Sequence, residues 1–137
     1  MGRTLTPRQF RQRLARITSP ESIREIGQAL YEAGDAVAVD AAISITTGAV
    51  SGKNHVPSSP GEPPNADTGV LDRSIETALV EPLRVEVSAN APYAKVLEKG
   101  GAKVEARPFM APALAKNRRP ATARVRKVVQ QILRDLK

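Results

Sequence analysis

The chain of 137 residues contains no cysteine, no tryptophan and a single histidine, His55. The absence of cysteine excludes a disulfide framework, a thiolate zinc site and a thiol nucleophile. One histidine leaves little room for metal or triad chemistry, because imidazole is the usual base and metal ligand near neutral pH. The aromatic residues are Phe10, Tyr31, Tyr93 and Phe109, too few for a platform that stacks the bases of single-stranded nucleic acid. We therefore expect no enzyme activity, no metal site and no cofactor.

Long apolar runs are also missing from the sequence. No stretch approaches the ~18 apolar residues that a membrane span needs, and the best candidate, Ala36 to Val50, is interrupted by Asp40. The first residues contain no apolar segment typical of a secretory signal. We therefore expect a single soluble domain over residues 1–137, made in a reducing cytoplasm and without a membrane partner.

Charge of both signs is plentiful, and it is segregated along the chain. The formal net charge is +7, from 21 Lys and Arg against 14 Asp and Glu. Basic residues dominate 1–30 and 99–137, whereas acidic residues dominate 31–98. Basic ends can contact DNA phosphates, or they can pair with the acidic middle of another copy. Solvated helix faces are the third explanation of the same pattern.

Two helices are predicted in the first third of the chain. Pro7 suits the first position of a helix over 7–17, in which apolar residues recur at spacings of three and four. Ser19, as an N-cap, begins a second helix whose apolar stripe continues to about Thr47. Alanines make the later turns of this long helix thin, so that another backbone can approach closely.

The segment 48–69 is rich in proline and shows neither a helical period nor strand alternation. Proline fixes φ and has no N–H to donate, so a loop or polyproline segment is predicted here. A loop of about twenty residues inside a small domain is uncommon and is usually functional or disordered. This segment is therefore the main candidate for a function outside the core.

A β-hairpin is predicted after the loop, because Ile75 to Leu79 and Leu83 to Ala89 alternate between apolar and polar residues. Glu81-Pro82 supplies the turn. A short helix over 93–98 and a short third strand over 103–106 are expected to follow.

A final helical region is predicted from Phe109, with a restart or kink at Pro120. The predicted fold class is therefore α+β. Its small antiparallel sheet, the hairpin plus the third strand, is packed by the long N-terminal helix and the C-terminal helix, and the Pro-rich loop is long.

Asp67-Thr68-Gly69 matches the catalytic triplet of retroviral-type aspartic proteases. In such proteases an apolar strand should precede the triplet and hold the carboxylate, whereas Pro63-Pro64-Asn65-Ala66 precedes it here. We therefore interpret Asp67 as an Asx-type turn at the point where the chain becomes ordered again, with Gly69 supplying a permissive backbone.

The C-terminal region carries a basic cluster that a DNA-binding module would use for phosphate contacts. Its DNA-facing or partner-facing candidates are Arg118, Arg119, Arg124 and Lys127. No helix-turn-helix pattern, zinc motif or basic zipper accompanies the cluster. A small basic DNA-binding protein that uses its Arg-rich ends is the alternative function.

Four segments occur in a familiar order and spacing. They are Ser59-Pro60-Gly61-Glu62-Pro63-Pro64, Asp67 to Ile75, Asn90-Ala91-Pro92-Tyr93-Ala94 with Glu98 and Gly100, and Arg107 to Leu114. Together they resemble the gene-product-ten-like tail-completion, or head–tail joining, family of long-tailed bacteriophages over residues 59–114. In one departure, Lys99, Gly100 and Gly101 follow Glu98, where that family usually has an aromatic residue and then Gly-Thr.

The resemblance implies a structural virion protein at the phage head–tail junction, a neck, tail-terminator or tail-completion protein assembled in the bacterial cytoplasm. Its partners would be copies of itself in a ring of six or twelve, the neighbouring connector or head-completion proteins, the tail-tube protein, and DNA in the channel through non-specific contacts. The residues that it suggests for assembly are Pro60, Gly61, Pro63, Pro64, Asp67, Thr68, Gly69, Tyr93, Glu98, Arg107, Pro108 and Phe109. Four of these residues would pack the sheet against the last helix: Tyr93, Arg107, Pro108 and Phe109. The second interpretation of these four is a direct contact with a partner protein.

We interpret residues 48–69 as an assembly arm because of their length and composition. Deleting residues 50–64 is expected to leave a folded monomer and to abolish ring formation, since the arm would order by lying across a neighbouring copy. Circular dichroism measures the fold and sedimentation velocity measures the assembly. Rings of unchanged subunit number from the deletion variant would contradict this hypothesis.

Overall fold

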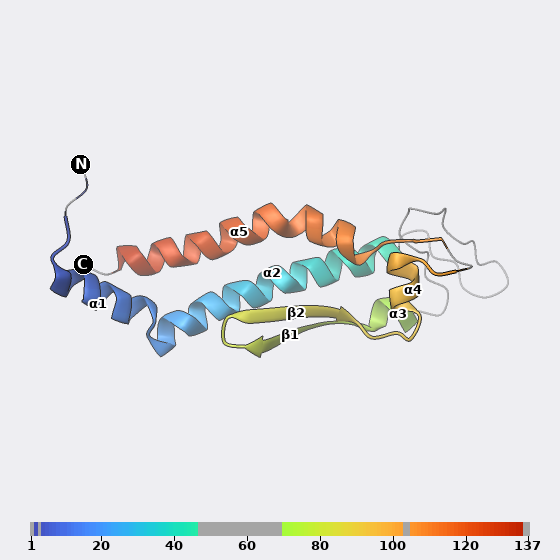
Figure 1. Ribbon diagram of the computed structural model, residues 1–137, viewed down its shortest axis with the longest axis horizontal. Helices are drawn as coiled ribbons and strands as arrows, with labels where there is room; N and C mark the ends of the chain where they lie inside the picture. The colour runs from blue at the N-terminus through green and yellow to red at the C-terminus, as the bar shows by residue number, and fades with distance from the viewer. Residues whose placement is uncertain (1, 3, 47–69, 103–104, 136–137) are drawn as a thin grey trace.

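The computed structural model describes residues 2, 4–46, 70–102 and 105–135. The long helix α2 (Pro20–Thr46) is the central element of an elongated molecule (Figure 1). Helix α5 (Met110–Arg134) runs antiparallel along one side of α2. A hairpin of β1 (Ile75–Glu81) and β2 (Arg84–Ala89) lies along the other side. The α+β class predicted from the sequence is confirmed, and α2 separates the hairpin from α5 along most of its length.

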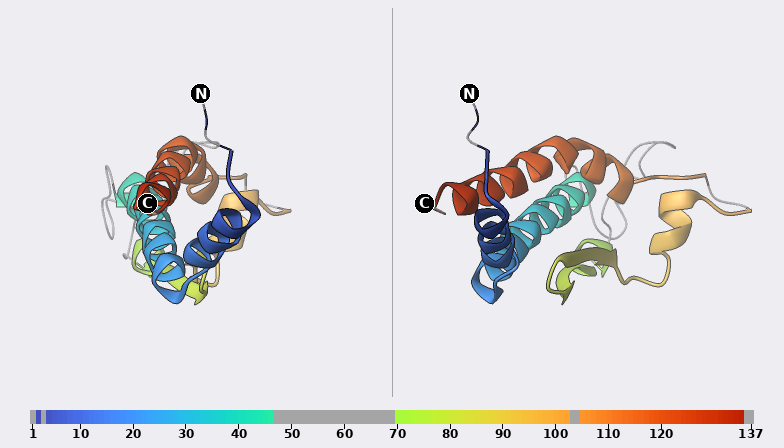
Figure 2. Two further views of the ribbon diagram at one scale, coloured as in Figure 1. Left: turned by 90° about the vertical axis from the view of Figure 1, so that its left-hand side faces the viewer. Right: turned by 60° about the vertical axis from the view of Figure 1, so that its left-hand side comes forward.

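Three short helices complete the fold at its two ends. Helix α1 (Pro7–Ile17) meets α2 at a sharp corner, near the C-terminus of α5 (Figure 2). Helices α3 (Val70–Arg73) and α4 (Ala94–Lys99) lie together at the opposite end (Figure 1). The predicted loop over 48–69 lies outside the described residues.

The predicted starts of α1 and α2 are confirmed in atomic detail. Thr6 and Gln9 form a capping box, in which Thr6 Oγ1 accepts the Gln9 N–H at 3.2 Å and Gln9 Oε1 accepts the Thr6 N–H at 2.9 Å. Ser19 Oγ accepts the Ser22 N–H at 3.2 Å, as an N-cap should. The short sequence between the two helices therefore ends one and starts the next.

The hairpin is antiparallel and pairs Ile75 with Ala89 and Leu79 with Val85. A register irregularity lies between Leu79 and Glu81. The predicted turn was one residue early, because Glu81 belongs to β1 and the turn is Pro82-Leu83. Proline has no N–H for a ladder, so its place in the turn is the physically favourable one.

The third strand predicted over 103–106 is not part of the sheet, which has two strands among the described residues. Glu105 and Ala106 have no strand structure, and the other two residues of the predicted strand lie outside the described part of the chain. The backbone N–H of Arg107 donates instead to the carbonyl of Leu97, at 2.6 Å. The described part of this segment is therefore tied to α4.

Pro120 does not divide the C-terminal region, since α5 continues through it as one helix. A proline inside a helix removes one backbone hydrogen bond and commonly bends the axis. The arched course of α5 in Figure 1 agrees with the bend, and the predicted restart does not occur.

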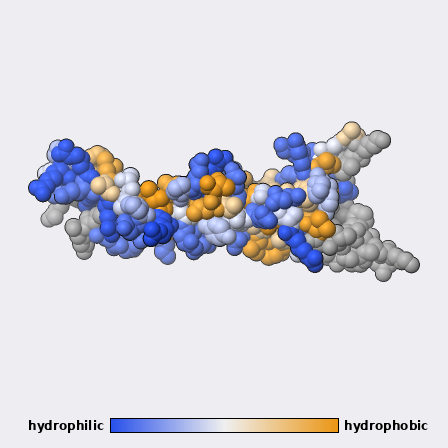
Figure 3. Space-filling view, turned by 90° about the horizontal axis from the view of Figure 1, so that it is seen from below, coloured by the Kyte–Doolittle hydropathy of each residue, from blue (hydrophilic) through white to orange (hydrophobic). Residues whose placement is uncertain are grey.

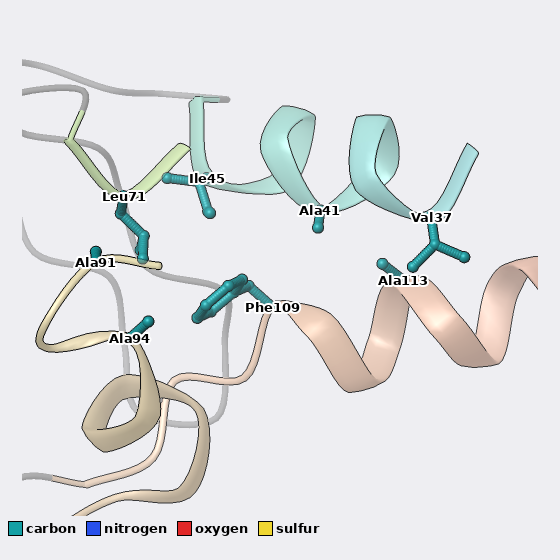
Figure 4. Packing of buried hydrophobic residues seen from close by; sticks show 8 residues of the cluster. All are labelled: Val37, Ala41, Ile45, Leu71, Ala91, Ala94, Phe109 and Ala113. Carbon is teal, nitrogen blue, oxygen red and sulfur yellow. The ribbon is translucent and has the colours of Figure 1, made fainter. Parts of the chain in front are cut away.

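The main core cluster lies where α2, α3, α4 and the start of α5 meet (Figure 4). Its largest fully buried side chains are Phe109 and Ile45. The remaining buried members are small or of medium size: Val37, Ala41, Leu71, Ala91, Ala94 and Ala113. The core of the described chain is therefore thin, and it depends on close packing of backbones more than on large side chains.

Two glycines of α2 explain how closely the hairpin approaches. A Cβ on Gly27 would stand 2.6 Å from the Pro82 carbonyl oxygen, and one on Gly34 would stand 2.6 Å from Val85 Cγ1. The two glycines are seven residues apart, which places them on one face of the helix. The hairpin therefore rests on α2 at its turn and again at its middle.

Gly27→Ala tests this contact. Alanine favours a helix over glycine by about 0.8–1.0 kcal/mol, but the added methyl group would collide with a backbone carbonyl, and overpacking typically costs about 1–3 kcal/mol. We expect a net loss of stability, measured as a lower urea midpoint. Glu25→Ala, at an exposed site nearby, is the control and should leave the midpoint almost unchanged. A Gly27→Ala variant more stable than the wild type would contradict the close approach.

Candidate functional site

The residues predicted for assembly fall into two groups. Those from the Pro-rich segment lie outside the described residues: Pro60, Gly61, Pro63, Pro64, Asp67, Thr68 and Gly69. The others surround the start of α5, which the structure describes in full. Their role in assembly stays a prediction, and their structural surroundings follow.

Phe109 is the central residue of the core, with 1% of its surface exposed. Its ring lies between Leu71, Ala94 and Ile45 in Figure 4. Pro108 beside it is half-buried, whereas Tyr93 at the start of α4 is 42% exposed. Phe109 thus packs helices of its own chain, and Tyr93 is the aromatic side chain of the pair that a partner can reach.

Glu98 holds the N-terminus of α5. Its Oε2 accepts the N–H groups of Phe109 at 2.8 Å and Met110 at 3.0 Å, and its Oε1 accepts the N–H of Ala111 at 2.8 Å. The first N–H groups of a helix have no partner inside it, and a carboxylate there also meets the positive end of the helix dipole. Glu98 therefore joins α4 to α5 within one chain.

A polar seam joins α5 to α2 further along. Asn117 is buried, and its Nδ2 donates to Asp40 Oδ2 at 2.7 Å and to the Ala113 carbonyl at 2.8 Å. Lys116 Nζ stands 3.7 Å from the same carboxylate oxygen. Because a buried amide without partners is costly, this contact fixes the position of α5 along α2.

The seam ends at an exposed ion pair. Arg124 Nη1 donates to Glu32 Oε2 at 2.9 Å. Hydrogen bonds from Gln28 and from Arg124 hold the pKa of Glu32 below its ordinary value. At a pH above the usual range of a carboxyl pKa, this ion pair stabilises the contact between the two helices. That contribution is lost as the pH falls through the lowered pKa of Glu32.

The other basic candidates, Arg118, Arg119 and Lys127, are exposed on α5. Helix α5 contains seven basic and no acidic residues. At about 100° per residue, a short solvent-facing stripe lies away from the side that holds Ala113 and Asn117. Its members are Arg118, Arg119 and Arg126, whereas Lys116, Lys127 and Arg134 lie nearer that side. Arg124 belongs to the seam, so the predicted cluster divides between a structural contact and a free surface.

Helix α1 presents an apolar face that the described part of the chain covers only in part. None of its residues is buried, and Phe10 and Leu14 are 54% and 45% exposed. Its four arginines, Arg8, Arg11, Arg13 and Arg16, form no ion pair within the described part of the chain. The helix is thus both basic and amphipathic, and about half of the surface of Phe10 and Leu14 is exposed.

An open groove of about 620 Å³ lies between the first half of α2 and the hairpin turn. Its walls are mainly apolar: Pro20, Ile23, Arg24, Gly27, Gln28, Tyr31, Leu79 and Pro82. Figure 3 views the molecule from the hairpin side, where orange apolar patches interrupt the polar surface. No residue of α1 belongs to the groove wall.

Sequence reasoning predicted that the sheet packs against the long helix, but it missed the groove and the two glycines at which the hairpin approaches α2. The signal was present, because two glycines seven residues apart in a long helix indicate a close approach on one face. Asn117 was missed as well. As one polar residue of a mainly basic helix it offers no sign of burial until its partner Asp40 is known.

Two classes of site find no support in the described residues. No group of three or more His, Cys, Asp or Glu side chains there is arranged to hold a metal ion. Within the same ranges, no helix combines the length and apolar character that crossing a bilayer requires.

Comparisons with protein-family models, with curated proteins and with solved structures gave no match to this chain. The resemblance of residues 59–114 to the phage tail-completion family therefore stays a prediction from the sequence.

Glu98→Ala separates a structural role from a contact with a partner. Losing a carboxylate that accepts three backbone N–H groups should lower the free energy of unfolding by about 1–3 kcal/mol, because those donors lose their acceptor. Chemical denaturation of dilute protein measures the loss. Glu105→Ala, at an exposed glutamate on the same connection, is the matched control. Equal unfolding midpoints for the two variants would contradict the capping role.

Proposed function

We propose that this protein is a structural virion component whose copies form a ring at the head–tail junction of a long-tailed phage. The observation that carries the proposal is the apolar face of α1, which the described residues leave about half exposed, on a protein whose own core is thin. An amphipathic helix usually buries its apolar face against another element. Copies of the same chain are the simplest source of that element.

The charge distribution supports assembly between copies. Helices α1 and α5 carry basic residues and no acidic ones, whereas α2 carries five acidic residues against the single Arg24. Complementary patches orient partners and suppress wrong pairings. A ring needs a heterologous interface, in which one patch meets a different patch of the next copy, and the chain has two such patches of opposite sign.

The location within a virion rests on the resemblance of residues 59–114 to the tail-completion family. The same resemblance supplies the partners, namely a connector or head-completion protein on one side and the tail-tube protein on the other. A structural role rather than catalysis agrees with the composition, which offers one histidine and no cysteine.

A small DNA-binding protein is the second candidate, and the basic stripe of α5 favours it. From Arg118 to Arg126 the stripe extends roughly 12 Å at 1.5 Å per residue, along the side of α5 that faces away from α2. In the ring, the same stripe would lie against DNA in the channel or against a neighbouring protein. Outside a ring, it would bind duplex DNA by phosphate contacts alone.

The mass of the purified protein and its salt dependence separate the two candidates. We expect native mass spectrometry to find a closed oligomer and electron microscopy to show rings. A chain that stays monomeric and binds duplex DNA, with an affinity that falls steeply between low and moderate salt, would instead support the DNA-binding alternative. Arg119→Gln combined with Arg126→Gln should reduce that salt slope by about two if both contact phosphates.

A further inference from the structure

We infer that α1 of one copy docks into the groove between α2 and the hairpin turn of the next copy. This inference rests on the proposed ring and names the contact that builds it. The occupant is a second copy of this chain, argued from three observations: two unmatched apolar surfaces, their complementary charges, and a corner that keeps them apart within one chain.

The apolar ridge of α1 and the apolar wall of the groove are complementary surfaces. Phe10 and Leu14 are four residues apart, so they form one ridge on α1. In the groove, Tyr31 of α2 and Leu79 of the hairpin supply exposed apolar side chains to the wall. Tyr31 and Leu79 are 37% and 50% exposed, and they lose most of that exposure if a helix lies over them. Large apolar side chains that enter an apolar groove are typical of interface hot spots.

The charges beside the two surfaces are opposite. A row of exposed side chains runs along α2 on the groove's flank, at alternating spacings of four and three: Glu21, Glu25, Gln28, Glu32 and Asp35. Glu32 pairs with Arg124, and Asp35 accepts a hydrogen bond from Thr77 at 3.4 Å. Glu21 and Glu25 form no ion pair within the described residues, and the four arginines of α1 form none either. Arg24 is the one basic residue on the groove wall, and the four acidic residues beside it leave this flank of α2 acidic.

The corner between α1 and α2 explains why the groove does not take the helix of its own chain. Ser22 is 4% exposed, and its Oγ donates to the Arg16 carbonyl at 2.7 Å. The Thr18 hydroxyl donates to the Leu14 carbonyl at 2.8 Å. The Ser22 bond joins α2 to α1 across the corner and holds α1 on a course that leads away from the hairpin, whereas the Thr18 bond ends α1 itself (Figures 1 and 2). Swinging α1 back would break the Ser22 bond, whereas a neighbouring copy can supply the helix with the corner intact.

Such a contact is heterologous, because one patch of a copy meets a different patch of its neighbour. Each copy then uses its helix once and its groove once, and the chain of contacts either closes into a ring or continues as a filament. Because each copy uses two different patches, variants that each lose one patch can be examined both separately and as a mixture.

The experiment uses two full-length variants, mixed and separate. Variant one carries Phe10→Gln and Leu14→Gln and keeps its groove. Variant two carries Tyr31→Gln and Leu79→Gln and keeps its helix. We expect each alone to self-associate at least about tenfold more weakly than the wild type. We expect their equimolar mixture to form heterodimers and nothing larger, measured by native mass spectrometry.

A third variant, Val39→Gln with Val96→Gln, alters side chains of similar exposure, 47% and 42%, away from both surfaces. It should assemble like the wild type. Circular dichroism and urea midpoints identify any variant that is unfolded, and Phe10→Gln alone, at the most exposed of the four sites, then replaces the double change.

The outcomes distinguish the inference from the proposal on which it rests. If variants one and two form rings of wild-type mass, the inference is overturned and the ring stands. If both lose the ring but their mixture gives no heterodimer, the helix and the groove do not pair, and the inference is overturned as well. If the wild type is monomeric at every concentration, the ring itself is wrong.

Discussion

The close approach of other elements to α2 is the constraint on which the rest of this structure depends. At Gly27 the Pro82 carbonyl of the hairpin turn leaves no room for a methyl group, and at Gly34 the Val85 side chain occupies the space that a Cβ would need. On the other side, the fully buried Ala41 belongs to the same core cluster as Ala113 of α5 (Figure 4). Dispersion contacts between closely packed atoms then replace the large interior side chains of a thicker domain. The consequence is an elongated fold in which many apolar side chains are left on the outside.

An interface of small side chains determines the relative position of two helices only weakly. Polar contacts determine the position of α5 along α2 instead. Asp40 in the last third of α2 meets Asn117 in the first third of α5, and Glu98 fixes the point where α5 begins. A displacement by one helical turn would leave the buried amide without its carboxylate, at a cost of about 1–3 kcal/mol. Two of the five acidic residues of α2, Glu32 and Asp40, are thus used to hold α5. The carboxylates nearer the N-terminus of α2 stay available for another basic element.

The sequence allowed the long elements to be predicted, because their signals are local. The bounds of α1 and the start of α2 follow from Pro7 and Ser19, whose effects reach only a few residues. The hairpin followed from its period of two. The local sequence pattern could not exclude the third strand. In the structure, the N–H of Arg107 donates to the carbonyl of Leu97 in α4, a contact that the local pattern does not indicate.

The site was harder to predict because it depends on pairs that are far apart in the chain. Glu98 was identified as a functional residue from a motif, yet its three hydrogen bonds reach residues 11 to 13 positions away and serve the fold. The groove joins Tyr31 to Leu79, and no periodic pattern connects them. The sequence does show one unbalanced element: the amphipathic helix α1 carries four arginines and no acidic residue. Such a helix gains little from its own chain. Its composition is explained once its partner is a surface with an apolar centre and an acidic edge, and the first half of α2 has both.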